Sequence, residues 1–383
     1  MKRIFPILLS LSLLLAACGS APAISTEPTE TSPTTQPSES QVQTQQMDMT
    51  AVALPATVET LSDTNGNEIF SYTYQSMSLV VADPDVADKI ILDFFSRQDQ
   101  HRTSAEAIHT LATENYTEGD WVPYLFSALY NPMRVDENVL SLAGTTVSWS
   151  GGNHPNYNCV YANYDMVTGD VMTLGSILTH KDKAAELCDL VIDAIAEVQE
   201  QYSIWSDYDK IIRNRFASDI SYDSAWFFDA NGLCFRFTPY EIAPYSSGII
   251  TVTIPYSKLT GIIEDAYFPV EQQVVQAEPK ASLMSQTNAE DFSQIAELVL
   301  DENGTMVLLY TDTLLYNVRI KVAGSPDYTA FSAAALTPGD AIMVQGDFDS
   351  NTLILEYRVD NQTYERYICV TADTVELSKQ IPE

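Results

Sequence analysis

The sequence predicts an α+β fold: an antiparallel sheet with two inserted helices, followed by a small all-β domain. Three observations predict this class. Segments rich in β-branched and aromatic residues alternate with polar turns along most of the chain. Helical periodicity interrupts the strands at only two places, near Asp83-Pro84 and near Ala184. From Ile295 onward the chain contains only short strand patterns separated by turns.

The N-terminus has the three parts of a secretory signal. Lys2 and Arg3 precede an apolar run from Ile4 to Leu15, and the small residues Ala16 and Ala17 close it. This run of about 12 residues is too short to remain in a bilayer as a spanning helix. We therefore predict a signal peptide over residues 1–17.

Residues 18–52 are predicted to be a disordered spacer. They consist mainly of Ser, Thr, Pro, Gln and Glu, with almost no large apolar side chains. Such a composition buries too little apolar surface to offset the entropy lost on ordering. As a flexible coil, the segment would span roughly 30–35 Å.

The charge balance excludes some classes of partner. The chain has 19 Lys and Arg against 52 Asp and Glu, giving a formal net charge of −33 at pH 7. Such a surface repels nucleic acids, so we expect no nucleic-acid partner. It attracts cationic proteins in a salt-dependent way. The alternative interpretation is that the charge serves solubility alone.

The first folded segment is predicted over residues 53–142. Glu68–Val81 alternates and is rich in β-formers, which predicts a strand pair. Asp83 as a cap and Pro84 in the first turn then begin a helix. Apolar residues at helical spacing continue it through Leu111, and strands resume at Tyr124.

The second segment is predicted over residues 143–268. Ser150-Gly151-Gly152 ends one strand, and the next occupies 156–165. An amphipathic helix follows from Ala184 to Tyr202. Asp229-Ala230-Asn231-Gly232 predicts a hairpin between strands at 224–229 and 233–239, and a last strand covers 248–254.

A linker is predicted at 269–290, because this stretch is polar and loosely patterned. The small β domain then covers 291–383. Its expected strands are 296–300, 305–310, 315–322, 341–345, 353–359 and 367–371.

Three stretches resemble known families. Leu15-Ala16-Ala17-Cys18 resembles the lipobox of bacterial lipoproteins. That resemblance implies that Cys18 is lipidated and anchors the chain to the extracytoplasmic face of the bacterial cell membrane. An ordinary cleaved signal with a chance cysteine is the alternative. Because only Met1-Lys2-Arg3 precede the signal core, we expect no cytosolic signalling segment.

The other two stretches occur together in one family of extracellular domains. Residues 149–157, with 164–169 after them, resemble the motif "GGAHPN…Y-D-x-x-T-G"; residues 237–248, with 254–256 after them, resemble "PYEIAPYAAG…IPY". The family includes the ectodomain of the lysozyme-sensing anti-sigma factor RsiV, and a related segment precedes the catalytic domain of the peptidoglycan deacetylase PdaC. Asn153 replaces an Ala, and Ser246-Ser247 replace Ala-Ala. The resemblance implies a PdaC-like segment at 53–142 and an RsiV C-terminal-like domain at 143–268.

The family resemblance also implies a binding face. In the family, loops of the RsiV ectodomain enter the cleft of lysozyme. The candidate binding residues here are His154, Pro155, Asn156, Tyr157, Pro239, Tyr240, Glu241, Pro244 and Tyr245. Prolines stiffen such loops and tyrosines serve as anchors. The alternative is that these residues only stabilise tight turns.

No catalytic or metal constellation is found in the sequence. The four histidines lack metal-ligand spacing, and no nucleophile elbow or phosphate loop is present. We therefore expect no cofactor, no metal and no deacetylase activity. Cys159, Cys188, Cys234 and Cys369 are expected to be free thiols within apolar elements rather than a disulfide framework.

The functional expectation is a lipid-anchored, non-catalytic binding module. It would capture lysozyme, another cationic cell-wall-active protein, or peptidoglycan glycan. The alternative is an enzyme that modifies cell-wall polymer, or its accessory subunit. A solute-binding lipoprotein for transport ranks last, because its two-lobed α/β pattern is missing.

Overall fold

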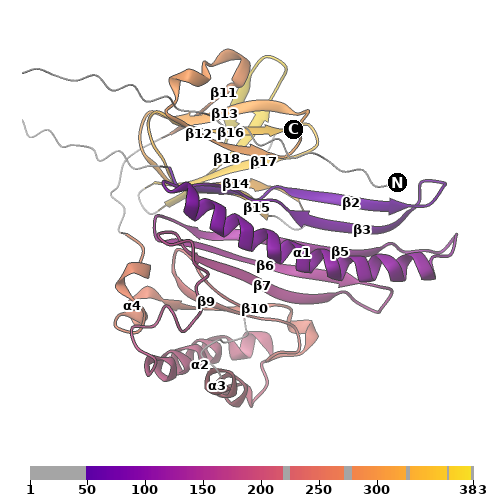
Figure 1. Ribbon diagram of the computed structural model, residues 1–383, viewed down its shortest axis with the longest axis vertical. Coiled ribbons are helices and arrows are strands. Elements are labelled where there is room, and N and C mark those ends of the chain that lie inside the picture. Colours follow the sequence, from indigo (N-terminus) through magenta and orange to yellow (C-terminus); the bar gives the residue numbers. More distant parts are fainter. Residues whose placement is uncertain (1–48, 219–224, 271–277, 325–327, 360–361, 381–383) are drawn as a thin grey trace, which may run out of the picture. The chain divides into compact units, whose positions relative to one another are not determined.

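The computed structural model describes residues 49–218, 225–270, 278–324, 328–359 and 362–380 (Figure 1). Cys18, the signal peptide and nearly all of the predicted spacer lie outside these residues. The fold is α+β with mostly antiparallel sheets, which confirms the predicted class. Within the described ranges, each helix is too short or too polar to cross a membrane.

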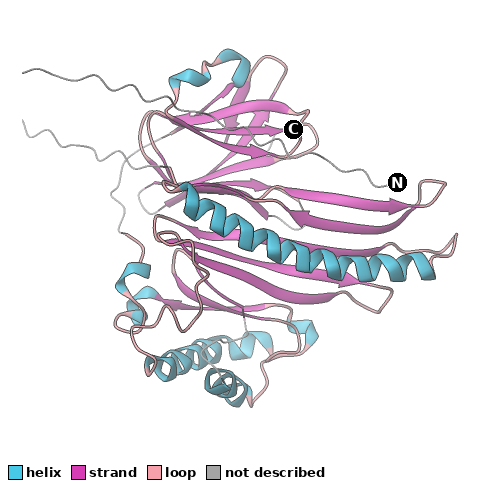
Figure 2. Ribbon diagram, viewed as in Figure 1, coloured by secondary structure: helices cyan, strands magenta, loops and turns pink. Residues whose placement is uncertain are grey.

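A five-stranded sheet with a long helix across it forms the first part. Its strands, in the order β2-β3-β5-β6-β7, are β2 (Ala56–Ser62), β3 (Glu68–Gln75), β5 (Tyr124–Val135), β6 (Val139–Trp149) and β7 (Asn156–Asp165). Helix α1 (Pro84–Asn115) packs over β3 and β5 (Figure 2). The side chain of Asp83 accepts a hydrogen bond from the Asp85 backbone N–H at 3.0 Å, which confirms the predicted start of the helix.

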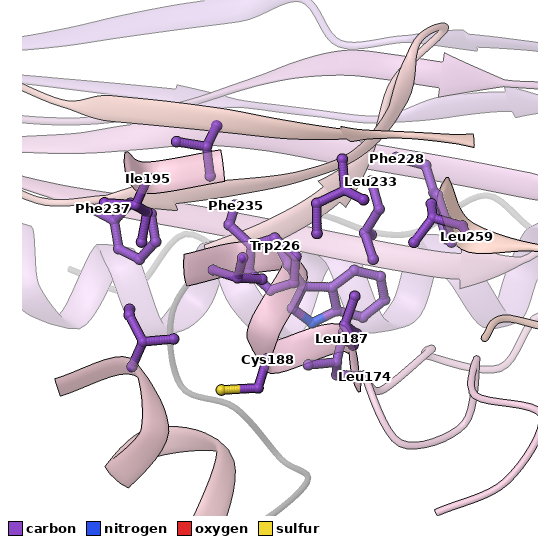
Figure 3. Packing of buried hydrophobic residues seen from close by; sticks show 14 of the residues in the cluster. Leu174, Leu187, Cys188, Ile195, Trp226, Phe228, Leu233, Phe235, Phe237 and Leu259 are labelled. Atoms are coloured by element: carbon purple, nitrogen blue, oxygen red, sulfur yellow. The ribbon is translucent and has the colours of Figure 1, made fainter. Parts of the chain in front are cut away.

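The second part is a three-stranded sheet covered by two helices. The sheet has the order β10-β9-β8 and consists of β8 (Ala225–Phe228), β9 (Gly232–Phe237) and β10 (Ile250–Pro255). The helices are α2 (Lys183–Tyr202) and α3 (Tyr208–Ser218), with a short α4 (Tyr256–Leu259) after β10. Trp226 packs among aliphatic side chains between this sheet and the helices (Figure 3). Helix α3 was not predicted, because its outward residues are mostly polar.

The third part contains two sheets. The larger has the order β19-β18-β17-β14-β15-β1-β4, and the smaller has the order β11-β13-β16-β12. Their strands are β1 (Ala51–Ala53), β4 (Ser78–Val80), β11 (Pro279–Leu283), β12 (Gln294–Val299), β13 (Thr305–Thr311), β14 (Leu315–Val322), β15 (Tyr328–Leu336), β16 (Asp340–Gly346), β17 (Leu353–Val359), β18 (Gln362–Val370) and β19 (Val375–Ser378). The all-β character predicted from 291 onward is therefore confirmed.

Two predicted boundaries differ from the structure. The expected spacer through residue 52 overlaps β1, which pairs with β15 on one side and β4 on the other. The expected linker at 269–290 contains β11, which pairs with β13. Strand β1 has three residues and its partner β15 lies far away along the chain, and β11 has only five residues within a polar stretch. The β domain is thus completed by strands from the N-terminal region.

Strand β1 and the residues beside it contribute to two hydrophobic cores at once. Met49, Ala51 and Ala53 are buried in the core of the third part. Val52 and Leu54 are buried with residues of α1 and the five-stranded sheet. This division follows from the strand period of two, which sends successive side chains to opposite faces.

A half-buried histidine lies between α1 and the sheet. His101 Nε2 lies 2.9 Å from the hydroxyl oxygen of Tyr130. Burial raises the pKa of Tyr130 to about 12, so its hydroxyl stays protonated at neutral pH. Burial and then the nearby Arg97 charge lower the pKa of His101. Both effects disfavour the protonated imidazole in the folded state.

We expect the free energy of unfolding to decrease as the pH falls below about 6.5, the pKa of histidine in an unfolded chain. Below that pH His101 is protonated in the unfolded chain but not yet in the folded protein, which favours unfolding. The decrease in unfolding free energy is complete once the pH is below the pKa of His101 in the folded state. Urea titrations at pH 7.5 and 5 measure the change, and His101→Gln should reduce it. His109→Gln is the control, since His109 is exposed. An equal pH dependence in His101→Gln and the wild type would contradict this prediction.

Candidate binding site

The two predicted binding loops meet in the structure. One is the β6–β7 connection at 150–155, and the other is the β9–β10 connection at 238–249. The ring of His154 stacks on that of Tyr245, with centroids 3.9 Å apart and an interplanar angle of 28°. The Tyr245 hydroxyl donates a hydrogen bond of 2.8 Å to the carbonyl oxygen of Pro155. Residues about ninety positions apart along the chain therefore form one surface.

Four side chains form this surface, which we call the aromatic patch: His154, Tyr157, Tyr240 and Tyr245. Tyr245 is its centre, with ring centroids 6.3 Å from Tyr157 and 5.7 Å from Tyr240. Tyr240 is 60% exposed and Tyr157 is 36% exposed. Partial burial raises the pKa of Tyr245, so its hydroxyl remains a donor at neutral pH. The patch thus offers aromatic rings to solvent on a fixed central residue.

The first loop is held by the residues at its base. The indole N–H of Trp149 donates to the carbonyl of Gly152 at 2.9 Å. Gly151 has φ +92°, and a Cβ there would lie 2.9 Å from the hydroxyl oxygen of Tyr124. The backbone angle therefore favours glycine, and a Cβ would also press on the Tyr124 side chain. These contacts fix the turn that presents His154.

The second loop is anchored by Glu241. One carboxylate oxygen accepts hydrogen bonds from the backbone N–H and the hydroxyl of Thr238, at 2.7 and 3.0 Å. The other oxygen forms an ion pair with Arg215 of α3. Ile242 and Ala243, which follow, are buried in the core of the second part. Of the predicted binding residues, Glu241 therefore holds the loop in place, while its neighbour Tyr240 stays exposed.

Tyr240 adopts a backbone conformation that a tyrosine rarely takes. Its φ is +67°, in the left-handed region, and its N–H donates to the carbonyl of Ala243 at 3.0 Å. For a residue with a Cβ this region costs roughly 1–2 kcal/mol. An exposed aromatic residue adds no core packing to offset that cost. Strain of this kind at a solvent-facing ring is typical of a binding residue.

The sequence did not single out Trp205, which adjoins the second loop. It lies between α2 and α3, is 37% exposed, and its backbone N–H donates to the carbonyl of Ile242 at 2.9 Å. The one available signal was an aromatic residue directly before the polar pair Ser206-Asp207. Because α3 was not predicted, this pattern did not place Trp205 beside the second loop.

Other residues of the two motifs stabilise the fold. The Asp165 carboxylate accepts hydrogen bonds from the backbone N–H groups of Val167 and Thr168, both at 2.9 Å, and so closes the turn after β7. Tyr256 donates its hydroxyl proton to the carbonyl of Asp229 at 2.9 Å and ties α4 to the β8–β9 hairpin. Part of the motif pattern is therefore structural.

Metal-ligand and thiol groups bear on the chemistry of the patch. Within the described ranges, no three His, Cys, Asp or Glu side chains are grouped to hold a metal ion. Cys159, Cys188, Cys234 and Cys369 are free thiols, which confirms that expectation. Burial raises the pKa of the Cys159 thiol to about 12, so it is not a reactive thiolate at neutral pH.

Comparison with known proteins gives one family match. Residues 176–257 match the model of a protein family of unknown function, DUF3298. Two solved structures of that family are similar in part. One, from Bacteroides fragilis, is 18% identical with a TM-score of 0.40, covering 57% of this chain and 95% of that one. The other, from Pseudomonas aeruginosa, is 16% identical with a TM-score of 0.40, covering 57% and 97%. No curated protein matches the chain.

Proposed function

We propose that this chain is a lipid-anchored cell-surface protein whose aromatic patch binds a cationic cell-wall-active protein, with lysozyme as the first candidate. The observation that carries the proposal is the meeting of two separately predicted loops in one exposed aromatic surface. The motifs of these loops resemble those of the RsiV ectodomain, which supports lysozyme as the ligand. The match of 176–257 to DUF3298 covers the second loop.

Charge supports a cationic partner. The net charge of −33 gives the protein a long-range negative field that would steer a basic protein toward it. Steering of this kind raises the association rate and weakens as salt is added. In this proposal Cys18 carries the lipid and residues 18–48 hold the folded part away from the membrane.

The patch is suited to binding because its central part is already ordered. Tyr245 is fixed by its stack on His154 and by its hydrogen bond to the Pro155 carbonyl. Anchors that are ordered before binding lose little conformational entropy when the partner arrives. Tyrosine is also among the residues that most often dominate the binding energy of an interface.

A glycan of the cell wall is the second candidate ligand, favoured by the exposed rings of Tyr157 and Tyr240. Aromatic rings open to solvent provide flat apolar faces on which sugar rings pack. The enzymatic alternative has no comparable support, because Asp165 and Glu241 are engaged in a turn and an ion pair.

Calorimetric titration with lysozyme, at low salt and at physiological salt, tests the proposal directly. We expect binding at both, tighter at low salt because the partners are oppositely charged. A parallel titration with a soluble peptidoglycan oligosaccharide tests the glycan candidate. If lysozyme binds at neither salt concentration, lysozyme is not the ligand. If neither lysozyme nor the oligosaccharide binds, the proposal is overturned.

Tyr240→Asn separates a binding role from a structural one. Asn tolerates the left-handed region better than other residues with a Cβ, so we expect the free energy of unfolding to rise by about 0.5–1 kcal/mol. Loss of an exposed anchor should weaken ligand binding by about tenfold or more. Met306→Asn is the matched control, since Met306 is exposed on β13. Unchanged affinity in Tyr240→Asn would remove Tyr240 from the site.

A further inference from the structure

A groove beside α1 lies apart from the aromatic patch. It has a volume of about 320 Å³ and is lined by Glu59 and Leu61 of β2, Phe70 of β3, and Arg102, Glu106 and His109 of α1. It exists because α1 packs over β3 and β5 and leaves β2, the edge strand, uncovered. We call it the α1 groove. Its volume is at the lower end of the range for small-ligand sites.

Arg102 is held in position at the groove. Its guanidinium carbon lies 5.6 Å from the ring centroid of Tyr72 and 5.2 Å from that of Tyr74. These distances are those of cation–π contacts. Arg102 Nη1 lies 3.8 Å from Glu59 Oε2, too far for a hydrogen bond. Since a guanidinium has five N–H donors, Arg102 retains donors suited to a carboxylate.

Glu106 lies one helical turn beyond Arg102 and lines the same groove. Residues at this spacing on a helix are neighbours and often form an ion pair. Among the described residues, the ion pair formed by Arg102 is with Glu59 and not with Glu106. The groove therefore presents the Arg102 guanidinium, with the Glu59 carboxylate beside it, and the Glu106 carboxylate. The backbone positions of Arg102 and Glu106 are about 6 Å apart along the helix axis.

The floor between these charges is apolar. Phe70 and Ala105 are buried, and Leu61 packs beside them. His109 contacts Phe70 edge to face, with centroids 5.6 Å apart, and also lines the groove. A ligand for this groove needs an apolar body between two ends of opposite charge.

We propose that the α1 groove binds a dipeptide-sized ligand with a free α-ammonium and a free α-carboxylate. The carboxylate pairs with Arg102 in place of Glu59, the ammonium with Glu106, and the side chain covers Phe70. An extended dipeptide spans at most about 7 Å, comparable to the axial spacing of residues four apart on a helix. This site shares no residue with the aromatic patch and does not depend on lysozyme or glycan binding.

The test uses three probes with the full chain, followed by calorimetry or NMR: the dipeptide Ala-Leu, its C-terminal amide, and its N-acetyl form. We expect Ala-Leu to bind at least about tenfold more tightly than either blocked form, because each blocked form loses a charge-assisted contact. Arg102→Gln should abolish the preference over the amide. Glu106→Gln should abolish the preference over the N-acetyl form.

The matched control is Arg213→Gln, which removes an exposed arginine paired with Asp189 on α2 and should leave every preference unchanged. A variant that merely perturbed folding would lower the affinity for all three probes together, and would not abolish the preference for one of them. No binding of Ala-Leu up to about 10 mM, or equal binding of all three probes to the wild type, would overturn the proposal.

Discussion

Val52→Asp is expected to lower the free energy of unfolding by more than about 4 kcal/mol. Val52 is fully buried and lies at the middle of β1, paired with Ser332 of β15 and Leu79 of β4. The substitution places a carboxylate in the core between α1 and the five-stranded sheet. Neither ionising nor protonating that group restores the lost apolar packing. Urea unfolding monitored by tryptophan fluorescence measures the loss.

The same variant should also loosen the C-terminal β domain, because its larger sheet contains β1. Hydrogen exchange measured on peptides from β15 should become faster. Val58→Asp is the matched control, since Val58 is 60% exposed on the edge strand β2, and it should change stability by less than about 1 kcal/mol. Unchanged exchange at β15 in Val52→Asp would show that the two cores unfold independently.

The sequence was sufficient to predict those elements that contain their own cap or turn residues. Helix α1 begins at Pro84 after the cap Asp83, and the β8–β9 hairpin turns through 229–232, as predicted. Strand β15 was missed because its run of alanines shows no alternation and is buried along almost its whole length. Strand β1 was missed because three residues cannot establish a period. Its stability comes from partners that no local pattern reveals.

In the candidate site, too, local features could be predicted from the sequence and tertiary contacts could not. Glycine, proline and tyrosine marked both loops as unusual, but nothing in either loop indicated that they would meet. Their contact depends on how the three-stranded sheet packs against β6 and β7, which is a tertiary property. The left-handed backbone of Tyr240 could not be predicted either, because tyrosine normally avoids that conformation. Sequence alone therefore identified the loops but not the surface that they form.

Arg134 joins the five-stranded sheet to the second part of the fold. It lies on β5 and is 5% exposed. Its guanidinium donates to the hydroxyl of Tyr256 at 2.8 Å and to the carbonyl of Tyr267 at 2.5 Å, and forms an ion pair with Asp136. Its carbon also lies 5.6 Å from the ring centroid of Phe228. One side chain thus provides charge, hydrogen bonds and a ring contact across this junction.

Arg134→Ala is therefore expected to cost about 3–5 kcal/mol of unfolding free energy, because Asp136 loses its cation and the Tyr267 carbonyl loses its donor in a buried place. Arg134→Lys should recover only part of this, since an ammonium cannot reproduce the planar fork. Arg213→Ala is the control: its pair with Asp189 is exposed, so the expected loss is below about 1 kcal/mol. Hydrogen exchange should become faster first in β8–β10, the sheet that Arg134 holds against β5. A loss in Arg134→Ala no larger than that in Arg213→Ala would mean that apolar packing alone maintains this junction.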